Sequence, residues 1–283
     1  MEFLLQTNKY IVGHHLSKTR FFPTIQYWLA DHPNIQNFSW KQGETPGSSL
    51  LFLSLTVISY LSLTYLFSHT TLISCSRRFL KSLTAIHSLI LLSLSFVMSL
   101  GCTLCIILIA PNVDYLICFP QKTPPTGPLF FWAYIFYISK IYEFMDTLLI
   151  ILSNSTRRLT FLHVYHHATV VVMCYISLHT SQSMFPGVLV TNAAVHVIMY
   201  FYYFLCALGI RPKWKKIVTD CQILQFFSSF GIMGLIFYYH FTGQGCSGIS
   251  GWWFDAVFIT SLLLLFLDFH AKTYSKKKIT KEN

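Results

Sequence analysis

Seven apolar runs, separated by short polar connections, constrain the fold of this chain more than any other feature. A helix needs about 17–25 mostly apolar residues to cross a bilayer. Soluble domains carry about 25% charged residues, whereas this chain carries 11%. We therefore predict an all-α, polytopic membrane protein with about seven transmembrane helices. The runs span approximately Ser49–Phe67, Leu83–Ala110, Leu129–Leu152, Leu162–Leu178, Phe185–Leu208, Ile217–Phe241 and Trp252–Ala271.

The connections predict which ends of these helices face the cytosol. Lys and Arg are concentrated in alternate connections, and by the positive-inside rule those connections are cytosolic. This places the N-terminus on the lumenal side and the C-terminus in the cytosol. Because the net charge of +10 is distributed in this way, it does not indicate nucleic-acid binding. The basic connections contain Arg77, Arg78 and Lys81, then Arg157 and Arg158, then Arg211, Lys213, Lys215 and Lys216, and the tail contains Lys272, Lys276, Lys277, Lys278 and Lys281.

We divide the chain into a polar lumenal lead-in (1–49), a seven-helix membrane domain (50–271) and a basic cytosolic tail (272–283). Asn37 begins a glycosylation sequon in the lumenal lead-in. A second sequon begins at Asn154, in a predicted cytosolic connection, where it should stay bare. Of the 8 cysteines, Cys118 and Cys246 fall in the predicted lumenal connections. We predict a disulfide between them, because the lumen is oxidising.

A histidine cluster, HVYHH at 163–167, opens the fourth apolar run. Residues at i, i+3 and i+4 share one face of an α-helix. His163, His166 and His167 are therefore expected to point into one patch. A single imidazole in an apolar helix is often a hydrogen-bonded core residue. Three on one face favour metal ligands or catalytic groups.

The third run carries Lys140, Glu143 and Asp146 at intervals of three residues. This spacing predicts a polar stripe along one side of the helix. Lys140 and Glu143 can also form a structural pair that lowers the cost of burial. A third charge remains unexplained by that pair, and ionisable residues at membrane depth are by default functional candidates.

The fifth and sixth runs carry polar residues as well. Asn192 and His196 are spaced i, i+4, and the tyrosines that follow are by themselves typical of an interfacial belt. Gln222 and Gln225 in the sixth run can also simply tie helices together. The predicted topology brings these residues and the histidine cluster into the cytosolic half. We expect a polar cavity that opens to the cytosol and continues as an apolar space into the bilayer.

Four motifs taken together resemble the fatty acid elongase (ELO) family of membrane condensing enzymes. The HxxHH motif alone is weak evidence, because membrane di-iron enzymes also use it, but the four motifs in this order are specific. The resemblance covers nearly the whole chain after residue 49, and the stretch FLHVYHHATVVVMCY is most similar to plant members. The motifs are KIYEFMDT (Lys140–Thr147), HVYHH (His163–His167), NAAVHVIMYFYY (Asn192–Tyr203) and TDCQILQ (Thr219–Gln225).

The resemblance implies an acyltransferase, a 3-oxoacyl-CoA synthase that condenses malonyl-CoA with a long-chain acyl-CoA. This is the first step of very-long-chain fatty acid elongation. Similar proteins are multi-pass enzymes of the endoplasmic reticulum membrane, with the acyl chain in a membrane tunnel and the CoA facing the cytosol. No cofactor is implied. The partners implied are membrane lipid and the reductases and dehydratase of the elongation cycle, and a homo-oligomer is compatible with the resemblance.

The resemblance also suggests roles for the four histidines. In similar proteins the middle His of HxxHH holds the acyl group in a ping-pong scheme, and imidazole is a competent acyl carrier. That position is His166. His167 and His196 are then candidates for proton handling and for binding the malonyl group, and His163 for orientation.

The other polar residues are assigned to support and substrate binding. Lys140, Glu143 and Asp146 are expected to hold the histidines and their charge state. The amides of Asn192 and Gln222 can donate hydrogen bonds to the thioester oxyanion. The supporting set is completed by Tyr200, Tyr203 and Gln225.

Two other function classes stay open. The clustered histidines and acidic residues would provide enough ligands for a membrane di-iron fatty acid oxygenase or desaturase, although membrane desaturases carry several separated His clusters and this chain has one. A transporter or receptor would have no need of a His cluster beside buried charges. The scattered histidines are interpreted as surface or packing residues. They are His14, His15, His69, His87, His179, His240 and His270.

Overall fold

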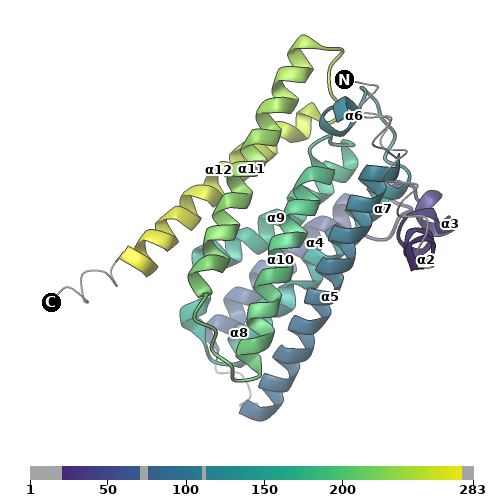
Figure 1. Ribbon diagram of the computed structural model, residues 1–283. Helices are drawn as coiled ribbons and strands as arrows, with labels where there is room; N and C mark the ends of the chain where they lie inside the picture. The colour runs from purple at the N-terminus through teal and green to yellow at the C-terminus, as the bar shows by residue number, and fades with distance from the viewer. Residues whose placement is uncertain (1–20, 71–75, 110–112, 276–283) are drawn as a thin grey trace.

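The computed structural model describes residues 21–70, 76–109 and 113–275, which form an all-α bundle (Figure 1). Within these residues the only β-pairing is two isolated bridges. Six of the described helices are long and apolar enough to cross a membrane. They are α4 (Leu50–His69), α5 (Arg77–Ile109), α9 (Phe161–His179), α10 (Phe185–Ala207), α11 (Lys215–Thr242) and α12 (Ile249–His270). The shorter helices are α2 (Phe21–Gln26), α3 (Pro33–Gln36), α6 (Val113–Ile117), α7 (Pro128–Tyr142) and α8 (Phe144–Leu152).

The prediction of one continuous helix over Leu129–Leu152 was wrong. The chain forms α7 and α8 there, with a break at Glu143. The amide of Asp146 donates to the carbonyl of Glu143, three residues back instead of four, at 3.0 Å, and such a bond tightens the helix locally. Each half is too short to cross a bilayer alone. A seventh crossing, by α7 and α8 together, stays a prediction.

The other six apolar runs form helices close to their predicted bounds. The largest difference is at α5, which begins at Arg77, so the basic residues placed in the preceding connection lie on its first turns. Ser49 begins α4 as its N-cap and accepts a hydrogen bond from the amide of Phe52 at 3.1 Å. In the lead-in, Ala30 and Trp40 are buried in the core of the bundle. The predictions for residues 1–20, including His14 and His15, and for 276–283 lie outside the described residues.

Six helices pack side by side in a closed ring, in the order α5, α7, α9, α12, α11 and α10. Helix α4 lies outside the ring, against α8 and α9. Helices α5 and α7 approach closely where Gly101 faces Trp132, since a Cβ at Gly101 would overlap the indole ring. The ring encloses an apolar core and the cavity that contains the candidate site.

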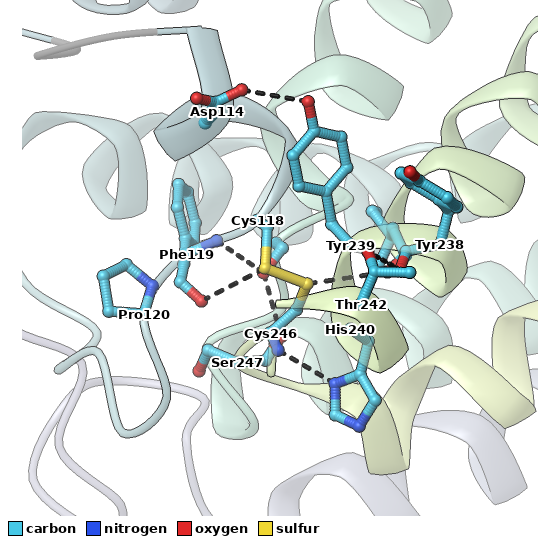
Figure 2. Close-up of a disulfide and its surroundings, with 12 residues drawn as sticks. Asp114, Cys118, Phe119, Pro120, Tyr238, Tyr239, His240, Thr242, Cys246 and Ser247 are labelled. Atoms are coloured by element: carbon cyan, nitrogen blue, oxygen red, sulfur yellow. Dashed lines mark hydrogen bonds between the residues drawn. A yellow bond between two sulfur atoms is a disulfide. The ribbon is translucent and has the colours of Figure 1, made fainter. Parts of the chain in front are cut away.

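The two ends of the bundle differ in chemistry. The end at the top of Figure 1 holds α6 and the turn between α11 and α12. Figure 2 shows the disulfide between Cys118 and Cys246 that joins these two segments, as the sequence predicts. The amide of Cys246 also donates to His240 Nδ1 at 2.9 Å (Figure 2). The opposite end contains the first turns of α5, the connection before α9 and the segment from the end of α10 to the first turn of α11. Together these segments carry nine of the 20 Lys and Arg.

Candidate active site

The histidine cluster lies on the first two turns of α9. Thr160 begins this helix and accepts a hydrogen bond from the amide of His163 at 3.2 Å. The ring centroids of His163 and His167 are 4.4 Å apart, and those of His166 and His167 are 5.4 Å apart. The three rings are neighbours as expected, but they do not face one common patch.

His163 faces α8 and α4. Its Nε2 is 2.9 Å from Thr147 Oγ1, and Thr147 Oγ1 is 3.0 Å from the hydroxyl of Tyr60. Two helices outside α9 therefore fix the orientation of this ring.

A buried ion-paired group lies at the break between α7 and α8. Lys140 Nζ donates to Glu143 Oε1 at 2.8 Å and lies 3.3 Å from His196 Nδ1. The same Glu143 oxygen lies 3.3 Å from His196 Nδ1. Lys140 and Glu143 are each 1% exposed. Removing one charge of such a pair leaves the other unpaired in a low-dielectric interior. Lys140 and Glu143 therefore stay paired, and together they fix the position of His196.

Asp146 anchors a second polar group, which includes a residue that the sequence interpretation missed. Its Oδ2 accepts a hydrogen bond from Tyr200 at 2.8 Å, and its Oδ1 lies 3.1 Å from Nε2 of His87 on α5. His87 is 3% exposed, so it is a packing residue and not a surface residue, and the prediction missed its hydrogen bond to Asp146. The available signal was a lone histidine within a long apolar run.

A narrow cavity of about 30 Å³ lies within the ring, bounded by α7 and by α9 to α12. His166 lines this cavity, together with Asn192 and Gln225. The Nδ1 atoms of His166 and His167 are buried and have no hydrogen-bond partner among the described residues. The remaining walls are mostly apolar and include Val170, Val188 and Phe258. The arrangement is a buried imidazole beside a mostly apolar space.

Two of the predicted supporting residues, Gln222 and Tyr203, belong neither to the cavity lining nor to the two polar groups described above. Gln225, not Gln222, lines the cavity beside Asn192, whose amide nitrogen is 3.4 Å from Gln225 Oε1. Gln222 instead packs its amide against the sulfur of Met199 at 3.4 Å. Tyr203 is 41% exposed, and its ring centroid is 5.9 Å from that of Tyr200. In the part of the chain that the structure describes, no group of three His, Cys, Asp or Glu side chains is arranged to hold a metal ion.

Comparison with known proteins identifies the family. The profile of the ELO family, described as the GNS1/SUR4 family, matches residues 45–282. A putative fatty acid elongase of Dictyostelium discoideum is 35% identical over 85% of this chain and 82% of its own length. Fatty acid elongase A of the same organism is 34% identical over 88% and 92%, and the fatty acid elongase 3-like protein of Arabidopsis thaliana is 27% identical over 94% and 98%. With this match over most of its length, and with the four motifs on helices that meet around one cavity, the chain belongs to the ELO family.

Proposed function

We propose that this chain is the condensing enzyme, a 3-oxoacyl-CoA synthase, of very-long-chain fatty acid elongation. Membership of the ELO family assigns the chain to fatty acid elongation, and the proposal adds the reaction. Acyl-CoA and malonyl-CoA, with one proton from solvent, give a 3-oxoacyl-CoA that is two carbons longer, together with CO₂ and free CoA. Reductases and a dehydratase would then consume the 3-oxo product.

One observation carries this proposal: His166 lines an apolar cavity, and its Nδ1 has no partner among the described residues. An acyl group carried on the other ring nitrogen, Nε2, can extend its hydrocarbon chain into that cavity. Imidazole forms reactive acyl intermediates. The chain also offers no better nucleophile in the cavity, whose described lining contains no Cys or Lys.

The reaction then has two half-reactions. In the first, His166 Nε2 attacks the thioester carbonyl, the C–S bond breaks, and CoA leaves with the proton of the imidazole. In the second, malonyl-CoA loses CO₂, and the resulting enolate carbon attacks the acyl-imidazole, whose C–N bond breaks. Asn192 lines the same cavity as His166 and is the candidate donor to the developing oxyanion. His196, fixed by Lys140 and Glu143, is the candidate for binding the malonyl group.

Incubation of the purified protein with acyl-CoA alone tests the first half-reaction. We expect release of free CoA and an acyl adduct on the peptide that contains 163–167, detected by mass spectrometry. His166→Ala should abolish both, and His167→Ala should keep the adduct while slowing the complete reaction. His179→Ala, an exposed histidine at the other end of α9, is the matched control. Release of CoA only after addition of malonyl-CoA would favour direct attack on bound acyl-CoA.

Metal analysis separates this proposal from di-iron chemistry. About two iron atoms per purified chain, the complement of a di-iron centre, would contradict the condensing enzyme.

We further propose that the disulfide end faces the lumen of the endoplasmic reticulum and that CoA binds at the basic, cytosolic end. Disulfides form in oxidising compartments, and Lys and Arg favour the cytosolic side. Glycan on the exposed Asn37 and none on Asn154 is the expected result of peptide mapping. Glycan on Asn154 would reverse the orientation.

A further inference from the structure

The end of the cavity remote from His166 carries two buried polar side chains among apolar walls. Gln182 follows the C-terminal end of α9, and Asp255 lies on the second turn of α12; both line the cavity. Each is 2% exposed. Gln182 Nε2 and Asp255 Oδ1 complete no well-aligned hydrogen bond within the described residues, although the Gln182 amide lies close enough to the Asp255 carboxylate to act as its donor. Buried polar atoms are normally satisfied, so this pair requires an explanation.

The amide of Gln182 is held in one orientation. Its Oε1 accepts a hydrogen bond from Ser177 Oγ at 2.6 Å, and its backbone amide donates to the carbonyl of Ser177 at 2.9 Å. The Nε2 group is therefore directed away from Ser177. Helix α12 packs tightly at this point, because a Cβ built on Gly251 would lie 3.3 Å from Gln182 Nε2. The pair thus offers a fixed donor beside a buried acceptor.

A hydroxyl group matches this pair, because it donates one hydrogen bond and accepts another. Beside the methyl end of an ordinary acyl chain, the two polar atoms would keep only their poorly aligned contact with each other. We propose that Gln182 and Asp255 bind a hydroxyl at the ω end of the acyl chain, so that this chain accepts ω-hydroxyacyl-CoA as a substrate. This inference rests on the proposed function, because it takes His166 as the site of the acyl carbonyl. Gln182 would donate to the hydroxyl oxygen, and Asp255 would accept its proton.

The length of α9 gives the chain length that reaches the pair. The Gln182 side chain lies level with Ser177, eleven residues after His166, and eleven helical residues rise about 16 Å. An extended chain advances about 1.2 Å per bond, since a three-bond residue of polypeptide spans about 3.6 Å. A chain of about 13 to 14 bonds therefore joins the two sites, which selects ω-hydroxytetradecanoyl-CoA as the probe.

Condensation assays with malonyl-CoA compare this probe with pentadecanoyl-CoA, in which a methyl group replaces the hydroxyl. We expect the wild type to favour the hydroxylated chain in kcat/KM by about tenfold or more, because a site built to bind a hydroxyl discriminates strongly against its absence. Gln182→Leu and Asp255→Val keep approximate side-chain bulk and should reverse the preference. Thr260→Val, on the exposed side of α12, is the matched control and should keep it.

A binding measurement separates this inference from the proposed reaction. Thioether analogues of the two acyl-CoAs cannot transfer their chains, so their affinities report the cavity alone. Tighter binding of the ω-hydroxy thioether to the wild type, lost in Gln182→Leu, would support the hydroxyl site even if no condensation occurs. Equal or weaker binding of the ω-hydroxy thioether would overturn it, and would mean that the pair holds only a water molecule, whatever the outcome of the condensation assay.

Discussion

Neutralising Lys140 tests whether the ion-paired group holds the site together. Lys140 Nζ lies 2.8 Å from Glu143 Oε1, a separation at which unit charges attract by about 6 kcal/mol at an effective dielectric constant of about 20. Burial costs several kcal/mol for each ion, so the pair contributes little net stability. Removal of one partner, however, leaves an unpaired charge in the interior. We expect Lys140→Met to lower the free energy of unfolding by about 3–5 kcal/mol.

The assay is reversible unfolding in mixed SDS micelles, followed by tryptophan fluorescence. The double variant Lys140→Met/Glu143→Leu should recover most of the loss, because no charge is then stranded. Recovery should be incomplete, because His196 Nδ1 contacts both side chains. Lys272→Met is the matched control: Lys272 pairs with Asp268 at 2.8 Å with its side chain 72% exposed, and such pairs contribute at most about 1 kcal/mol. Equal effects of Lys140→Met and Lys272→Met, or strict additivity in the double variant, would refute the reasoning.

Three further predictions concern the packing, the disulfide and the cavity. Gly101→Ala should destabilise the fold by about 1–3 kcal/mol through overlap with Trp132, whereas Gly231→Ala, with nothing within 4 Å, should raise helix stability by up to about 1 kcal/mol; thermal unfolding compares the two. Cys118→Ser should cost about 2–4 kcal/mol, and recovery of both thiols free in non-reducing peptide maps of the wild type would contradict the disulfide. Gln182 also lines a second, smaller cavity, so Gln182→Ala should join the two spaces and lengthen the products seen by gas chromatography.

The sequence predicted the helices well because apolar runs of bilayer length have few other stable structures. It did not predict the break at Glu143. The run 129–152 contains neither Gly nor Pro, and these are the common local causes of helix breaks. The break instead coincides with the residue whose carboxylate contacts both Lys140 and His196. Such contacts between helices are invisible in the sequence of one helix.

The site was predicted at the level of helices but not of every partner. Motif order was sufficient to bring His166 and Asn192 to the same cavity. It could not decide which of Gln222 and Gln225 faces the cavity, because that depends on the rotation of α11 about its axis. Asp255 carried a signal that the interpretation overlooked: a carboxylate in an apolar run is a functional candidate by default.

The two ends of the cavity should control different properties of the proposed reaction: its rate at one end and the choice of acyl chain at the other. The ion-paired group around Lys140 and the imidazole of His166 lie toward the basic end, where positive charge favours the anionic CoA part of the proposed substrate. Gln182 and Asp255 line the cavity at its other end, where the ω end of the acyl chain is proposed to bind. Substitutions near Lys140 should therefore change the rate for every acyl chain alike. Substitutions at Gln182 should change which chains are accepted, because the distance from His166 to the polar pair is set by the rigid helix α9.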